Sequence, residues 1–491
     1  MREFSLISLL EVARRAYDGP RMDEMDWNKS LFRTIQTLVA EHKLGYQGPE
    51  LYLGVGDSYT DRLFQAAADL VSSLGVYCVS TNRVINFSKE EVLDAATEAP
   101  QEVIVGEGRD ARTVKKRLVE DRRKANVIVG GHAPWRQEDA VTAQAAYASV
   151  ARGDLIEGFN MLHCDGYDVH GLPMAVHAAK REAEMMREAV RQAGRPGMAI
   201  TLYPILTSSG PMIAPSDPEQ GLRRTDGLLL SILPDMKVEA DYIANAIHYE
   251  RYGGYKVNGG CYTNVGGFCG GVEGATVEVV AKALAAWLVY RDQMQYNATV
   301  FSQSHLTESR WHLGMEDKPT EDRMTVPLWA TYAVNRALER NTNIIRFGGH
   351  IIHSGRGGIG SEADLLSVSK AEIVNTVMGL NLNCIITYNA TPYHARFRAE
   401  VSDATVDVGL KREEAPRLLK ELDSAINARL AGRSYPQQGD RRMLVYVDYE
   451  RYYGQMKEAY DFARAQPSKQ FMENAIRARK TLKDLGLNMK T

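Results

Sequence analysis

The sequence predicts an α/β protein built on a TIM (β/α)8 barrel. Short apolar segments alternate with helical segments along the middle of the 491-residue chain. That order is typical of parallel sheets whose strands are joined by helices. The apolar segments number about eight over roughly 270 residues, which suits the strand count and span of a TIM barrel. A doubly wound open sheet is the alternative fold for the same pattern.

Each expected strand is a run of four or five mainly apolar residues, as a strand buried on both faces requires. Helices are expected at 174–193, 277–288 and 361–378, where longer periodic segments separate these runs. The expected strands are 126–129, 155–159, 198–202, 228–232, 244–247, 298–301, 343–347 and 383–387.

The segments on either side of the barrel are expected to be helical. Residues 1–120 are expected to form a mostly helical N-terminal extension that includes an amphipathic helix at 61–74. Residues 121–412 hold the barrel, and residues 413–491 are expected to form a charged helical segment packed on it.

Composition excludes some functions. Apolar residues make up 44%, charged residues 25%, and the net charge is -3, so nothing indicates nucleic-acid binding. No apolar run approaches the length of a membrane span, and Glu11, Arg14 and Arg15 interrupt any secretory signal near the start. The five cysteines are irregularly spaced, which argues against a disulfide framework. We expect a soluble protein of the reducing cytoplasm that has no membrane partner.

A glycine-rich segment matches the G-x-G-x-x-G pattern at 355–360. It follows the expected strand 343–347 and precedes the expected helix 361–378, as a dinucleotide-binding loop does. The next strand is followed by Tyr388 and Asn389, where NAD binding requires an acid. Three interpretations stay open: a tight turn, an NAD site, or a loop that lets the backbone approach a corrin or phosphate. The candidate cofactor-binding residues are Gly355, Arg356, Gly357 and Gly358.

Candidate site residues follow the expected strands because catalytic groups of TIM barrels lie at the C-terminal strand ends. Aromatic rings nearby offer cation–π contacts to a quaternary ammonium, although packing in the core or at the rim explains them equally. The catalytic candidates are Thr201, Tyr203, His248, His350 and His353. The substrate-binding candidates are Trp135, Tyr249, Tyr262, Phe268 and Ser354.

No resident metal is expected. Cys261 and Cys269 do not have the spacing of a zinc knuckle, although a site that combines them with His248 stays open. The segment from Asp168 to Pro173 is similar to half of the D-x-H-x-x-G motif in which a histidine ligates corrinoid cobalt. Pro173 stands where that motif requires glycine, so we interpret the match as a coincidence.

The run from Ala193 to Met198 belongs to a set of short segments that follow one another over nearly the whole chain. In this order the segments resemble the monomethylamine:corrinoid methyltransferases. The strongest match is Ala193 to Met198, which in that family precedes the catalytic pyrrolysine. Counted without gaps, the pyrrolysine position falls on Thr201. The other matching segments are 75–78 with Thr81 and Arg83, 105–111 with Val114, Lys116, Arg117 and Asp121, then 225–226, 248–249, 266–273 and 484–487.

The departures from the family concern its active site. Threonine has no electrophilic imine to hold an amine, so Thr201 cannot replace pyrrolysine. Two glutamates that surround the family's pyrrolysine fall near Leu229 and Gly260, and a glutamine falls near Ile351 or Ile352. The residues with which the family captures an amine are therefore all replaced at the matching positions.

The resemblance implies a homo-oligomeric methyltransferase whose corrinoid (cobamide) is supplied by a separate protein, with no cofactor held tightly by this chain. Without capture, the donor is expected to be a methylated amine that leaves easily, such as a quaternary ammonium, and binding would rely on orientation and cation–π contacts. Two other functions stay open: an NAD- or phosphate-binding enzyme built on Gly355–Gly360, and a non-catalytic binding descendant of the barrel.

Overall fold

Eight parallel strands close into a barrel in the order in which they occur along the chain. The last strand returns beside the first, where Leu382 lies opposite Val127. A closed parallel barrel confirms the predicted TIM fold and excludes the open doubly wound sheet. The strands are β5 (Val127–Gly131), β6 (Leu155–Glu157), β9 (Ala199–Leu202), β10 (Gly227–Leu230), β12 (Tyr255–Asn258), β14 (Met294–Tyr296), β16 (Ile345–Gly348) and β17 (Asn381–Ile386).

This computed structural model describes most of the chain. The described residues are 7–46, 53–131, 135–203, 208–259, 262–265, 267–296, 299–301, 322–348, 358–386, 391–430 and 449–489.

One expected strand was wrong, a second is a strand that lies outside the barrel, and two barrel strands went unpredicted. Residues 244–247 belong to helix α8 (Ala240–Tyr252), because a four-residue apolar run fits a buried helical face as well as a strand. Residues 298–301 overlap β15 (Thr299–Phe301), which pairs with β13 (Tyr262–Asn264) outside the barrel. The barrel uses β12 and β14 instead.

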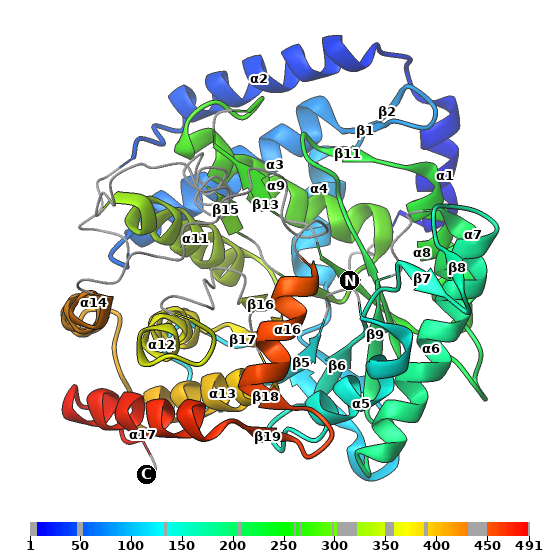
Figure 1. Ribbon diagram of the computed structural model, residues 1–491. Helices are drawn as coiled ribbons and strands as arrows, with labels where there is room; N and C mark the ends of the chain where they lie inside the picture. The colour runs from blue at the N-terminus through cyan, green and yellow to red at the C-terminus, as the bar shows by residue number, and fades with distance from the viewer. Residues whose placement is uncertain are drawn as a thin grey trace.

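Helices connect the strands around the outside of the barrel (Figure 1). Helix α9 is apolar on nearly every face because helices of the N-terminal extension cover its outer side, and only Glu273 within it is not buried. The helices are α5 (Gln137–Ala148), α6 (Met174–Gln192), α7 (Ser209–Ile213), α8, α9 (Val272–Tyr290), α11 (Asp322–Asn341), α12 (Glu362–Val377) and α13 (Pro392–Val408).

The N-terminal extension packs mainly against α9 and α11. Its first strand pairs with β11 (Lys237–Val238), which ties the extension to the chain between β10 and α8. Several of its helices begin at side-chain caps; Ser88, for example, forms a capping box with Glu91. The elements are α1 (Leu9–Asp18), α2 (Glu24–Glu41), α3 (Asp57–Leu74), β1 (Val76–Cys78), β2 (Arg83–Ile85), α4 (Lys89–Glu98), β3 (Glu102–Val105), the 3₁₀ turn Gly108–Asp110 and β4 (Arg112–Lys115).

The β3–β4 hairpin closes the N-terminal end of the barrel. Val105 and Val114 join the apolar cluster inside the barrel. The backbone N–H groups of Gly106 and Glu107 donate to Thr225 and Gly197, which lie just before β10 and β9. The C-terminal strand ends are therefore the side from which a ligand can enter.

In Figure 1 the C-terminal segment, in orange and red, runs from α14 (Ala415–Leu430) at the left past α16 (Tyr449–Ala459) near the centre of the view to α17 (Lys469–Asp484) along the lower edge. Helices α14 and α17 pack against α12. Between them come α16 and the hairpin of β18 (Tyr460–Asp461) and β19 (Gln466–Pro467). Within the described residues, no helix combines the length and the apolar character needed to cross a membrane.

Candidate active site

The inward-facing side chains of the barrel form two levels. Four strands carry a small or apolar residue at the lower level, which contacts the hairpin that closes the barrel. Two residues further on, the same face of each strand carries a polar or aromatic residue, as the alternation of a strand requires. The four pairs are Leu155 and Glu157, Ala199 and Thr201, Met294 and Tyr296, and Ile345 and Phe347.

The upper level contains a cluster that we call the polar layer, made of Glu157, Thr201, Tyr255 and Tyr296. The hydroxyl groups of Thr201 and Tyr255 are hydrogen-bonded at 2.8 Å. Glu157 and Thr201 lie directly opposite each other on β6 and β9. All four side chains are buried, so the layer sits within the barrel below its C-terminal opening.

Tyr255 reaches the polar layer from the start of β12 because a glycine lets it cross β10. Its ring lies over Gly227: a Cβ added at Gly227 would come within 2.0 Å of the ring. In register, Gly227 stands between Thr201 and Tyr255, on the neighbouring strands. The glycine therefore creates the path along which the phenol meets Thr201.

Both phenols of the polar layer remain protonated at neutral pH. Burial raises the pKa of Tyr255 well above its usual range, and the Asp226 and Glu157 carboxylates raise it further. Burial also raises the pKa of Tyr296, and the nearby Tyr255 and Glu157 side chains raise it further. The layer thus combines one buried carboxyl group with two neutral phenols and one hydroxyl.

One position where the resemblance places a glutamate is apolar. Leu229 faces the barrel interior, and its side chain covers Gly259, where an added Cβ would lie 2.1 Å away. The other family positions near Gly260, Ile351 and Ile352 lie outside the described residues.

Thr201 and Tyr203, two of the predicted catalytic residues, lie close together at the upper end of β9. Thr201 is fully buried, and Tyr203 packs partly buried against the interior cluster. A hydrogen bond links Tyr203 to Tyr242 of α8. The structure therefore brings these two candidates to one side of the barrel interior.

His248 and Tyr249 lie at the opposite end of the barrel from the expected site. They belong to α8, which ends at Tyr252 just before β12 begins, so they do not follow a strand. The His248 ring stacks on Tyr252 and its Nε2 lies 3.1 Å from the Ser216 hydroxyl. Burial lowers the pKa of His248. Tyr249 is fully buried in the outer core.

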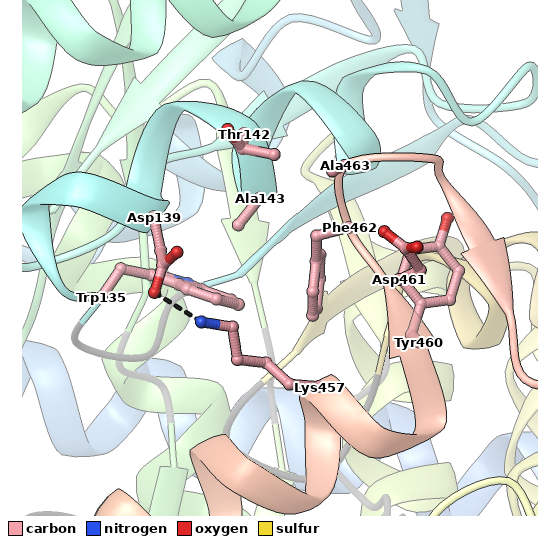
Figure 2. A pocket seen from close by; sticks show the side chains of 9 residues that line it. All are labelled: Trp135, Asp139, Thr142, Ala143, Lys457, Tyr460, Asp461, Phe462 and Ala463. Carbon is pink, nitrogen blue, oxygen red and sulfur yellow. Dashed lines mark hydrogen bonds and ion pairs between the residues drawn. The ribbon is translucent and has the colours of Figure 1, made fainter.

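Trp135 lies beneath the C-terminal segment. Its indole N–H donates to the carbonyl of Gly131, and its ring meets Tyr453 and Phe462 edge-on at 5.5 and 5.2 Å. Trp135 and Phe462 line a cavity of about 280 Å³. Figure 2 shows the two rings with the Asp139–Lys457 ion pair beside them. The ring contacts described for Trp135 are thus with this segment, and its indole N–H is bonded to β5.

The remaining candidates are scattered or undescribed. Phe268 packs partly buried against the outer core ahead of α9, and Tyr262 belongs to β13 outside the barrel. Gly358 has a φ of +103°, a conformation that favours glycine. The residues outside the described ranges are Cys261, His350, His353, Ser354, Gly355, Arg356 and Gly357, and the side chain of Tyr262.

The open zinc interpretation of Cys269 with His248 does not fit the topology. Cys269 lies before α9, at the C-terminal strand ends, whereas His248 lies near the N-terminal ends. The D-x-H segment is on the surface, where Asp168 pairs with both His163 and His170.

Sequence reasoning missed Glu157. The residue lies within the expected strand 155–159, and an acid at the end of an otherwise apolar strand was the available signal. A buried carboxyl group among apolar residues of a barrel strand is a candidate for a functional site.

A closed (β/α)8 barrel with a buried polar layer toward its C-terminal strand ends defines a protein of the TIM-barrel class with an interior site. A family model described as monomethylamine methyltransferase MtmB matches residues 7–487. The chain therefore belongs to this methyltransferase family.

Curated relatives and solved structures agree with the family match. Monomethylamine methyltransferase MtmB2 of Methanosarcina acetivorans is 25% identical over 483 residues, and MtmB1 of the same organism is 26% identical; each match covers 96% of both chains. The crystal structure of Methanosarcina barkeri monomethylamine methyltransferase superposes with a TM-score of 0.79 at 23% identity, covering 99% of this chain and 100% of that one. The latter similarity supports the barrel fold.

Proposed function

We propose that this protein transfers a methyl group from a cationic N-methyl compound, preferably a quaternary ammonium, to the cobalt of a separate corrinoid protein. The observation that carries the proposal is the polar layer: a buried carboxyl group lies beside aromatic rings, and Thr201 stands where the family resemblance places pyrrolysine.

Thr201 has no group that can capture an amine, and its hydroxyl is already bonded to Tyr255. The donor must then leave without covalent help. A quaternary ammonium does so because the electrons of the broken C–N bond stay with nitrogen and yield a neutral tertiary amine. A primary amine would need a proton to leave in the same way.

The upper level of the barrel suits a cation. Glu157 supplies a potential countercharge, and Tyr296 and Phe347 meet edge-on at 5.2 Å as part of the same wall. Aromatic faces attract ammonium groups, more strongly where water is excluded. Orientation of the methyl group toward the opening would then supply most of the catalysis.

The reduced corrinoid would supply a nucleophilic cobalt that accepts the methyl group. Because the β3–β4 hairpin closes the other end, the partner is expected to approach from the C-terminal strand ends. The loop at 355–357 that was proposed to contact a corrin lies outside the described residues. Among the described residues, Cys78, Cys164, Cys269 and Cys384 form no disulfide. Reduced cysteines are usual in the cytoplasm, which is the location we propose.

The test is to mix the protein with a chemically reduced corrinoid protein and a panel of primary to quaternary methylamines, and to follow the loss of Co(I) absorbance. We expect turnover with a quaternary donor. Turnover with monomethylamine alone would contradict the proposed substrate class and indicate the specificity named for the relatives. Tight binding of the corrinoid protein without turnover of any donor would favour the non-catalytic alternative.

The variant Glu157→Gln tests the countercharge. An ion pair at about 5 Å in an effective dielectric near 20 is worth about 3 kcal/mol, so KM for a cationic donor should rise by roughly two orders of magnitude. Inhibition by a neutral tert-butyl analogue should hardly change. The matched control is Glu188→Gln, which removes a surface carboxylate of α6. Equal KM values in Glu157→Gln and Glu188→Gln would show that Glu157 does not act as the countercharge.

A further inference from the structure

A second cluster of chemically active side chains lies in the connection between β6 and α6. The hairpin of β7 (His163–Cys164) and β8 (Tyr167–Asp168) reverses through Asp165 and Gly166. Both residues have positive φ, 49° and 86°, as a tight two-residue turn requires. The turn fixes Cys164 and Asp165 beside the first turn of α6, which carries His177.

Three potential ligand atoms converge there. Cys164 Sγ, Asp165 Oδ2 and His177 Nε2 all lie within 4.8 Å of one another. The carboxylate oxygen is 2.7 Å from the His177 nitrogen and 3.9 Å from the sulfur. Ligands of a tetrahedral zinc ion, at bond lengths of about 2.0–2.3 Å, lie roughly 3.5 Å apart. Side-chain shifts of about an ångström are enough to complete this geometry.

Gln137 orients the carboxylate. Its side-chain amide donates to Asp165 Oδ1 at 2.6 Å, and its carbonyl accepts the Asp165 backbone N–H at 2.7 Å. With Oδ1 held, Oδ2 faces His177 and Cys164. Such an outer partner is the usual support of a metal-binding carboxylate.

One side of the three-residue cluster is open to solvent. Cys164 is buried, whereas the side chains of Asp165 and His177 are 42% and 48% exposed. A tetrahedral ion held here would have three protein ligands and one position toward solvent. The connection follows β6, so the cluster lies at the end of the barrel where the C-terminal strand ends meet.

The charges of the ligands balance that of a divalent cation, and one neighbouring cationic side chain opposes its binding. A thiolate and a carboxylate together neutralise a divalent cation. Arg181 Nε lies 3.7 Å from Asp165 Oδ2, and it also pairs with Glu184. The guanidinium is therefore expected to weaken the site without abolishing it.

We propose that Cys164, Asp165 and His177 bind a zinc-type divalent cation with one open coordination position. Binding breaks the S–H bond of Cys164, releases its proton, and forms bonds from sulfur, oxygen and nitrogen to the ion. The proposal does not depend on the identity of the methyl donor.

The test is titration of the purified full-length protein with Co²⁺, which reports thiolate ligation through a charge-transfer band in the near ultraviolet. We expect one equivalent to bind, Zn²⁺ to displace it, and Cys164→Ser to abolish the band. His177→Ala should weaken binding at least tenfold, and Gln137→Ala by about ten- to a hundredfold. Arg181→Gln should tighten binding.

Two controls separate this site from other thiols and histidines. Cys269→Ser removes a buried cysteine elsewhere, and His170→Gln removes an exposed neighbouring imidazole; neither should change the titration. Absence of the band in the unaltered protein, its persistence in Cys164→Ser, or its loss in Cys269→Ser would overturn the assignment. If Cys164→Ser does not fold, the test depends on His177→Ala. An unchanged affinity of that variant for Co²⁺ would also overturn the assignment.

Discussion

Replacement of Gly227 by alanine should destabilise the protein through a single ring. An added Cβ would lie 2.0 Å from Tyr255 Cε2 and 2.6 Å from its Cζ, well inside van der Waals contact. The ring is buried over β10 inside the barrel and cannot swing into solvent. It must shift, and its hydroxyl then loses the 2.8 Å hydrogen bond to Thr201.

The expected cost has two parts. Overpacking a buried site costs about 1–3 kcal/mol. The lost hydrogen bond adds about 1 kcal/mol. The sum is about 2–4 kcal/mol. A chain of this length has an unfolding entropy of about 1 kcal/mol/K, so the melting temperature should fall by about 2–4 °C.

The assay is a double-mutant cycle of Gly227→Ala and Tyr255→Ala, followed by thermal unfolding. Tyr255→Ala alone should cost about 3–5 kcal/mol because it empties a buried aromatic site. In its background, Gly227→Ala should cost almost nothing, since the ring is gone. The control is Gly454→Ala in α16, where an added Cβ meets nothing within 4 Å and the helix should gain up to about 1 kcal/mol.

Two results would refute this reasoning. Gly227→Ala could leave the melting temperature unchanged, which would mean that the ring does not occupy the space over the glycine. Alternatively, it could cost the same with and without Tyr255, in which case the strain would come from the backbone of β10.

Three further predictions concern buried polar groups. Burial raises the pKa of Glu182 to about 8 from 4.5, so the folded protein keeps a proton that the unfolded chain releases. The free energy of unfolding should therefore fall by up to a few kcal/mol as pH rises from about 5 to 8. Thermal unfolding of Glu182→Gln should show a weaker dependence on pH, and an unchanged dependence would argue against the raised pKa of Glu182. Asp226→Asn removes the buried charge that pairs with the partly buried Arg187 and should cost about 3–5 kcal/mol in urea unfolding. A loss below 1 kcal/mol would show that the pair is unimportant. Thr201→Val keeps the shape but removes the hydroxyl, and should lower both stability, by about 1–3 kcal/mol, and turnover; unchanged turnover would exclude the Thr201 hydroxyl from the active site.

The number of barrel strands was predictable from the sequence, but two of the eight were assigned to the wrong segments. β12 carries Lys256 and Asn258, and β14 carries Gln295, so neither is an apolar run. These polar side chains are buried by tertiary contacts. The Gln295 amide, for example, donates to the Ala283 carbonyl of α9 at 2.8 Å. Such a partner cannot be recognised before the fold is known.

The positions of the candidate site residues were predictable where they depended on correctly assigned strands. Thr201 and Tyr203 follow from the correct assignment of β9 and lie in or beside the barrel interior. His248 and Tyr249 depended on a strand at 244–247, and the helix that replaces it carries them to the other end of the barrel. Glu157 was missed because burial of a carboxyl group is a property of the closed barrel.

The pairing of β17 with β5 also constrains how the chain can fold. Val127 cannot meet Leu382 until almost the whole barrel has been synthesised, so the ring has a high contact order and should close slowly. Until then, β5 and the β3–β4 hairpin expose apolar surface and unpaired backbone to the cell. Truncated forms that end before β17 should consequently aggregate or recruit chaperones.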